Sequence, residues 1–234
     1  VDVTEAALPE LSPVPEVVFP ALHGTFGEDG GLQSLLEQQQ IPFVGTRAEA
    51  SRLIMDKVAT KQILLDNDIP TPWFMAVTEP DTENPDAARF PLVIKPANQG
   101  STVGMTRMWR PSGWWRRGLK KAFAVDTMAL AESYVRGTEL TVSVIDGRAM
   151  PAIEIIPPGN RMFDYDAKYT HQRGHTEYNC PPCRVDPAAV KTAQSFAETV
   201  FSLLGAKDLL RVDFIIDADG KPWVLEANSI PGFT

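Results

Sequence analysis

The sequence contains little cysteine and no long apolar run, and both shortages exclude classes of protein. Two cysteines in 234 residues are too few for a disulfide framework, so a reducing, cytoplasmic setting is expected. No apolar run reaches the roughly 18 residues of a membrane span, so no membrane partner is expected. Acidic residues outnumber basic ones by 30 to 22, a net charge of −8, and this excess argues against a general nucleic-acid binder.

Several catalytic signatures are also missing. The chain has neither the Gly-x-Ser-x-Gly elbow of a hydrolase nor a dinucleotide-binding fingerprint. Four potential zinc ligands do occur within thirteen residues, namely His171, His175, Cys180 and Cys183. We favour two buried or idle thiols at the exit of a loop, because no redox fold surrounds the cysteines, and we expect no bound zinc.

The apolar pattern predicts a mixed fold of α/β plus α+β type. Apolar residues make up 44% of the chain, enough for one large domain or two small ones. A strand, a glycine-rich loop, a helix and a second strand at the start predict a partial parallel α/β unit. The rest reads as antiparallel sheets with helices on one side, including two hairpins turned at residues 146–147 and 217–220.

The expected elements are short, as the 20 prolines suggest. A long polar loop is expected over 157–183. The expected helices cover residues 32–36, 48–67, 112–125 and 188–204. The expected strands cover residues 17–22, 41–45, 73–77, 92–95, 103–108, 129–135, 140–145, 150–156, 209–216 and 223–228.

The last hairpin carries the clearest chemical signal. Side chains alternate faces along a strand, so Arg211 and Asp213 share one face. On the partner strand Glu226 and Asn228 share a face, and face parity pairs Asp213 with Glu226. Two carboxylates and an amide oxygen are hard donors that suit Mg²⁺. The alternative is a solvated polar face with an Arg–Asp ion pair.

Two lysines are candidates for phosphate binding. Lys95 ends an apolar strand and is followed by the loop around Gly100 and Gly104, rich in Gly, Ser and Thr. Such a loop can cradle phosphates with its backbone N–H groups, although it can also be a plain hairpin turn. Lys57 follows Met55-Asp56 and could equally be a surface lysine of a helix.

Seven motifs in order resemble the D-alanine–D-alanine ligases of the ATP-grasp superfamily, from about residue 16 onward. They are HGTFGEDG (23–30), MDK (55–57), PLVIKPANQGSTVG (91–104), ESYVRGTELTVSV (132–144), FDYDAKY (163–169), RVDF (211–214) and LEANSIPGFT (225–234). The resemblance implies a partial N-terminal domain (1–46), a central ATP-grasp lobe (47–135) and a C-terminal lobe (136–234). In the family, a glycine-rich segment precedes the part matched here, and a last helix follows it.

The resemblance also assigns roles in binding ATP and metal. Lys57 and Lys95 would contact phosphates, and Glu139 would hold the ribose hydroxyls. Two Mg²⁺ or Mn²⁺ ions would be bound by Asp213, Glu226 and Asn228. The remaining nucleotide-binding positions would be Glu132, Ser133, Tyr134 and Val135 at the adenine, and Lys168 in a lid formed by residues 160–180.

Other residues would serve the D-alanine substrates. Ser101 and Tyr169 would link the glycine-rich loop to the lid by hydrogen bonds, and His23 would lie near D-alanine. Arg211 and the Gly232 N–H would stabilise the tetrahedral intermediate.

The implied function is ATP-dependent formation of D-alanyl-D-alanine through an acyl phosphate, for peptidoglycan precursor synthesis. A homodimer is expected. Two alternatives stay open: another ATP-grasp carboxylate–amine or D-alanyl-D-lactate ligase, and a catalytically incomplete homologue that only binds nucleotide.

Overall fold

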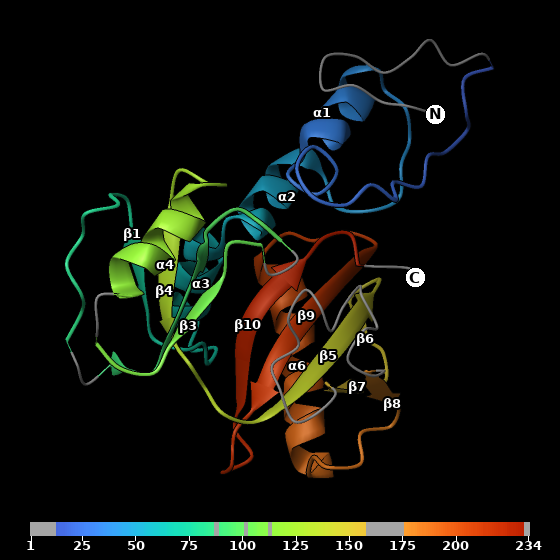
Figure 1. Cartoon of the computed structure of the whole chain (residues 1–234). Helices are drawn as coiled ribbons and strands as arrows, with labels where there is room; N and C mark the ends of the chain where they lie inside the picture. The colour runs from blue at the N-terminus through green and yellow to red at the C-terminus, as the bar shows by residue number, and fades with distance from the viewer. Residues whose placement is uncertain (1–12, 87–88, 101–102, 112–113, 158–175, 232–234) are drawn as a thin grey trace.

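The computed structural model describes residues 13–86, 89–100, 103–111, 114–157, 176–231. It contains two antiparallel sheets with helices packed on them, and a small N-terminal segment above both (Figure 1). None of the helices in these ranges is long and apolar enough to cross a membrane.

The N-terminal segment contains less sheet than predicted. Helix α1 (Gly31–Gln38) packs Leu32 and Leu36 against Ile41. The strands expected at 17–22 and 41–45 are wrong as strands, because the structure has one parallel bridge between Val18 and Phe43. Prolines at positions 20 and 42 lack the N–H that would extend a ladder on either side.

The helical stretch predicted over 48–67 is confirmed as two helices, α2 (Ala48–Met55) and α3 (Lys57–Asp66). Asp56 separates them. Its side chain accepts hydrogen bonds from the N–H groups of Val58 and Ala59 at 2.9 and 3.0 Å, which is the geometry of an N-cap. The cap begins α3 at Lys57 and so fixes this lysine on the first turn.

The first sheet has the strand order β1-β4-β2-β3. Its strands are β1 (Phe74–Val77), β2 (Leu92–Pro96), β3 (Thr106–Met108) and β4 (Ala129–Ser133). Helix α4 (Trp114–Phe123) packs Trp115, Leu119 and Ala122 into the core of this sheet. Gly118 allows this helix to approach the sheet closely, because a Cβ atom at that position would lie only 2.6 Å from Ile94 Cδ1.

The second sheet has the order β10-β9-β5-β7-β8, with β6 paired to β5. Its strands are β5 (Thr138–Ile145), β6 (Arg148–Ala149), β7 (Ile153–Ile156), β8 (Glu177–Asn179), β9 (Leu209–Ile216) and β10 (Pro222–Asn228). The prediction of a polar loop over 157–183 is wrong at residues 177–179, because these residues form strand β8. It is a short edge strand with two exposed residues, so it has no apolar alternation to read.

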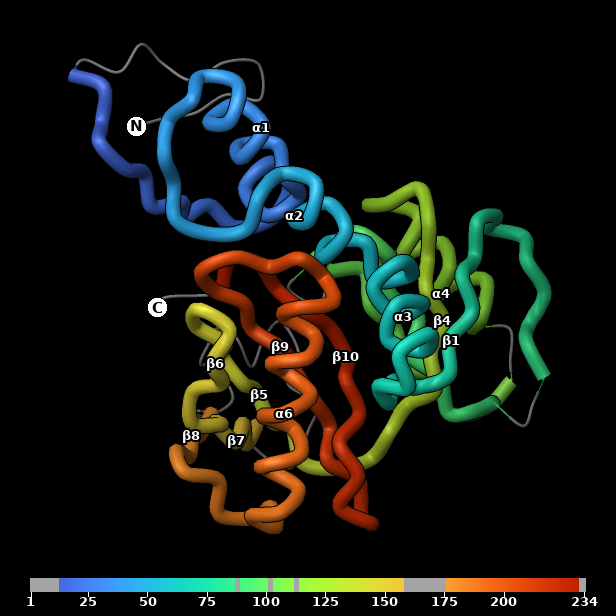
Figure 2. The backbone as a smooth tube through the Cα atoms, turned by 180° about the vertical axis from the view of Figure 1, so that it is seen from behind, coloured from blue at the N-terminus to red at the C-terminus, as the bar shows by residue number. Residues whose placement is uncertain are grey.

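Helix α6 (Pro187–Leu203) covers one face of the second sheet, and Figure 2 shows it in front of β9. The predicted cap is confirmed, since Asp186 accepts a hydrogen bond from Ala188 N and Pro187 stands at the first turn. Ile54 of α2 and Leu64 of α3 join the same hydrophobic core. The second sheet is therefore tied to α2 and α3, the helices that precede the first sheet.

Candidate active site

The final hairpin brings the predicted carboxylate face together. Asp213 and Glu226 are direct partners across β9 and β10, and Asn228 is opposite Arg211. The predicted register is confirmed, and a β-bulge at Leu225 produces it. Without the extra residue, Glu226 would point to the other face of the sheet.

Asp213 is the most heavily bonded group of this hairpin. It accepts hydrogen bonds from Arg211 Nε and Nη2 at 2.9–3.2 Å, from Thr141 Oγ1 at 2.6 Å and from Asn228 Nδ2 at 3.2 Å. Burial would lower the pKa of Arg211, but the Asp213 carboxylate raises it above its usual range. The aspartate is thus held in one orientation on the polar face.

Lys57 connects this hairpin to the loop after β2, the glycine-rich loop that contains Gly100 and Gly104. Its Nζ donates to Gln99 O at 2.7 Å and lies 3.9 Å from Glu226 Oε2. Its backbone N–H donates to Ala97 O at 3.1 Å. Burial lowers the pKa of Lys57, although Glu226 acts in the opposite direction. The lysine that could have been a surface residue is therefore 7% exposed and faces a carboxylate.

Lys95 and Lys61 share a buried carboxylate. Lys95 Nζ lies 2.6 Å from Glu132 Oε1, and Lys61 Nζ lies 2.9 Å from Glu132 Oε2. Burial alone would raise the pKa of Glu132, but the two ammonium groups lower it. Burial alone would lower the pKa of Lys95, but Glu132 and Glu226 raise it. Sequence reasoning missed Lys61, although a lysine four residues after Lys57 lies on the same face of α3.

Glu28 is a second site residue that sequence reasoning missed. Its carboxylate accepts a hydrogen bond from Gly24 N, and a Cβ atom at Gly100 would lie 4.0 Å from its Oε2. Burial raises its pKa, and the nearby charges of His23 and Arg211 lower it. Glu28 therefore lies close to Gly100 of the loop after β2, and its charge interacts with that of Arg211 on the hairpin. The exposed His23 lies in the same loop.

The segment predicted to meet adenine spans the end of β4 and the two residues after it. Two of its N–H groups are already used, since Ser133 N donates to Trp73 O and Tyr134 N to Pro91 O, both at 2.8 Å. The Tyr134 ring is flanked by the Arg107 guanidinium, 4.8 Å from its centroid. Val135 is next along the chain, and Glu139 lies on the central strand β5, between β7 and β9.

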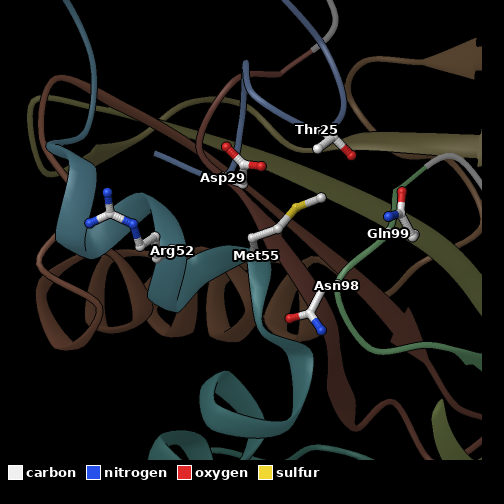
Figure 3. A pocket seen from close by; sticks show the side chains of 6 residues that line it. All are labelled: Thr25, Asp29, Arg52, Met55, Asn98 and Gln99. Carbon is white, nitrogen blue, oxygen red and sulfur yellow. The ribbon is translucent and has the colours of Figure 1, made fainter. Parts of the chain in front are cut away.

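A small pocket lies next to the contact between Lys57 and Gln99. It has a volume of about 250 Å³ and lies where the N-terminal loop, α2 and the loop after β2 meet (Figure 3). Its lining residues are Thr25, Asp29, Arg52, Met55, Asn98 and Gln99. Gln99 also accepts the hydrogen bond from Lys57, so the pocket adjoins the charged cluster.

Several predicted residues lie outside the described residues. These are Ser101, Lys168, Tyr169, Gly232, His171 and His175. Cys180 and Cys183 are exposed free thiols. In the described ranges no group of three or more His, Cys, Asp or Glu side chains could hold a metal ion. A metal at the hairpin would therefore rely on two carboxylates and the Asn228 amide.

Comparison with known families decides what kind of site this is. Residues 63–234 match the family described as D-ala D-ala ligase C-terminus, and residues 3–46 match D-ala D-ala ligase N-terminus. The chain belongs to the D-alanine–D-alanine ligase family. The predicted resemblance is confirmed by curated relatives of that name. The ligase of Pelotomaculum thermopropionicum is 39% identical over 232 residues, spanning 94% of this chain and 71% of the relative. That of Bordetella petrii is 40% identical over 241 residues, spanning all of this chain and 72% of the relative.

Solved ligase structures share the fold. A D-alanine–D-alanine ligase from Bacillus anthracis superimposes with a TM-score of 0.82 and 31% identity, covering 95% of this chain and 72% of that one. The same ligase complexed with ATP gives 0.78 and 28%, covering 94% and 69%. The predicted ATP-grasp fold is thereby confirmed, and with it the enzyme class.

Proposed function

We propose that this chain joins two D-alanine molecules into D-alanyl-D-alanine at the expense of ATP. The observation that carries the proposal is the meeting of Lys57, Lys95 and the Asp213–Glu226 pair at one place. Cations and carboxylates gathered so closely suit a triphosphate with bound metal. The chain's membership of the ligase family supplies the choice of substrate.

The phosphates of ATP would lie against Lys57 and Lys95. Lys57 is buried and Lys95 is largely buried. A hydrogen bond to Gln99 O and an ion pair with Glu132 hold their ammonium groups, so little reorganisation is needed when phosphate arrives. The adenine would lie beside Glu132, Ser133, Tyr134 and Val135, and the ribose near Glu139. The glycine-rich loop and the lid would close over the nucleotide through Ser101, Lys168 and Tyr169.

The hairpin would hold the metal. Mg²⁺ is usually bound by one or two carboxylates together with substrate phosphates, and Asp213, Glu226 and Asn228 offer such a set. We propose two Mg²⁺ or Mn²⁺ ions there. When bound, they would neutralise charge on the transferring phosphoryl group.

The chemistry follows in two steps. A carboxylate oxygen of the first D-alanine attacks the γ-phosphorus, ADP leaves, and an acyl phosphate forms. The amine of the second D-alanine then attacks the acyl carbon, phosphate leaves, and the amine loses a proton. Arg211 and the Gly232 N–H would stabilise the oxyanion of this second step.

The N-terminal loop would bind the amino-acid end of the site. The charge of Glu28 interacts with those of His23, Arg211 and Glu226, so we propose that its carboxylate faces a substrate ammonium while Arg211 faces a substrate carboxylate. We also propose the division into a partial N-terminal domain (1–46), a central lobe (47–135) and a C-terminal lobe (136–234), a homodimer, and a cytoplasmic setting in which ATP is available.

The test is phosphate release from ATP with different acceptors. D-alanine should stimulate release in step with dipeptide formation, whereas D-lactate and L-alanine should stimulate it at least tenfold less. Release that favours D-lactate would support the depsipeptide ligase instead. ATP binding without release under any acceptor would identify a protein that only binds nucleotide.

A further inference from the structure

Lys61 is the most deeply buried charged group near the site, yet it has no role in the proposed reaction. Its side chain is 1% exposed. Its Nζ forms an ion pair with Glu132 Oε2 at 2.9 Å, donates to Thr71 Oγ1 at 2.5 Å, and lies 5.7 Å from the centre of the Phe74 ring. The charge of Lys61 is therefore held inside the protein by one hydrogen bond, one ion pair and a cation–π contact.

One branch of this network leads to the phosphate lysine. Glu132 has a different ammonium on each oxygen, Lys95 on Oε1 and Lys61 on Oε2. A carboxylate with a cation at only one oxygen can rotate, but a cation at each oxygen restrains its plane. Lys61 therefore fixes the oxygen that holds the Lys95 ammonium, without reaching the phosphate itself.

The other branch leads to the metal hairpin. Thr71 Oγ1 donates to Val224 O at 2.9 Å, and Val224 N donates to Pro70 O at 2.8 Å. Val224 is the last regularly paired residue before the bulge that turns Glu226 toward Asp213. These two hydrogen bonds cover the outer edge of β10 at the point where its register shifts.

We infer that Lys61 is a positioning residue for the reaction. Through Glu132 it orients Lys95, and through Thr71 it holds the strand register that places Glu226 opposite Asp213. A single buried ammonium thus sets the separation between the phosphate lysine in the central lobe and the metal carboxylate in the C-terminal lobe. The roles of Lys95 and Glu226 in this inference rest on the proposed function.

The test compares Lys61→Met, which removes the charge, with Lys61→Arg, which keeps it. The exposed Lys207→Met serves as the matched control, because the Lys207–Asp208 pair is open to solvent. Lys61→Met should lower kcat/KM for ATP at least tenfold and leave the KM for D-alanine within twofold. Lys61→Arg should recover part of the loss, and Lys207→Met should match wild type. A kcat/KM for ATP within twofold of wild type in Lys61→Met would overturn the inference, as would an equal loss toward both substrates.

Two further measurements cover other outcomes. If Lys61→Met does not fold, Thr71→Val keeps all charges but cuts the link to Val224. It should lower kcat/KM for ATP at least threefold, and full activity would overturn the inference. The rise in melting temperature caused by MgATP separates the two claims. Suppose that the wild-type protein has no ligase activity but is stabilised by MgATP, and that Lys61→Met loses this stabilisation. That result would refute the proposed function and retain this inference. A wild type without any shift would refute both.

Discussion

Removing Lys95 should weaken the protein even when no nucleotide is present. Its side chain is 12% exposed and its Nζ lies 2.6 Å from Glu132 Oε1. Breaking a buried ion pair from one side costs about 3–5 kcal/mol. Glu132 keeps Lys61 as a partner, so the lower end, about 3 kcal/mol, is expected for Lys95→Ala. For a chain of this size that is a fall in melting temperature of about 6–12 °C.

The assay is urea unfolding followed by tryptophan fluorescence, with and without MgATP. The control is Lys207→Ala, whose exposed ion pair should contribute no more than about 1 kcal/mol. MgATP at 100 times its Kd should stabilise wild type by about 2.7 kcal/mol, and Lys95→Ala should lose most of that gain. If Lys95 served only to bind phosphate, its removal would not change the free energy of unfolding of the protein without nucleotide. A loss below about 0.5 kcal/mol without nucleotide would therefore refute the ion-pair argument.

Three other predictions follow from the same contacts. Asp213→Asn keeps the shape of the side chain but removes the charge that Arg211 faces, so the Mg²⁺ concentration for half-maximal activity should rise at least tenfold in a metal titration. Burial lowers the pKa of Lys61 from 10.5 to about 8. Between these two pH values the unfolded state binds more protons than the folded state. The free energy of unfolding should therefore rise by up to about 3 kcal/mol as the pH increases from 8 to 10.5. Lys61→Met should lack this rise in denaturation series from pH 8 to 10.5. His171→Ala should keep the preference for D-alanine over D-lactate at pH 7 while Tyr169→Phe lowers the rate, and an inverted preference in competition assays would show that the lid is aligned differently.

Local pattern was enough to predict the elements that carry most of the site. The alternation of faces along β9 and β10 selected the pairing of Asp213 with Glu226. The Asp-Pro start of α6 and the apolar runs of the strands were read from short-range chemistry alone. The start of α6 is set by neighbours in the chain, whereas the pairing of Asp213 with Glu226 also depends on the bulge at Leu225.

Features set by distant residues could not be predicted in this way. The carboxylate shared by Lys61 and Lys95 belongs to Glu132, far along the chain from Lys61, and no local pattern pairs them. Charged residues inside otherwise apolar stretches were the available signal, because a buried charge requires a partner. The prediction of strands at 17–22 and 41–45 was wrong for a similar reason, because an apolar run forms a strand only where neighbouring strands complete its hydrogen-bond ladder.

The most direct test of the account follows one oxygen atom. D-alanine labelled with ¹⁸O in its carboxylate is incubated with ATP, Mg²⁺ and the protein, and the released phosphate is analysed by mass spectrometry. Attack by the carboxylate on the γ-phosphorus, followed by displacement at the acyl carbon, must leave that oxygen on phosphate. One ¹⁸O atom should therefore appear in phosphate for each D-alanyl-D-alanine formed. Dipeptide formed with unlabelled phosphate, or labelled D-alanine that yields no dipeptide, would contradict it.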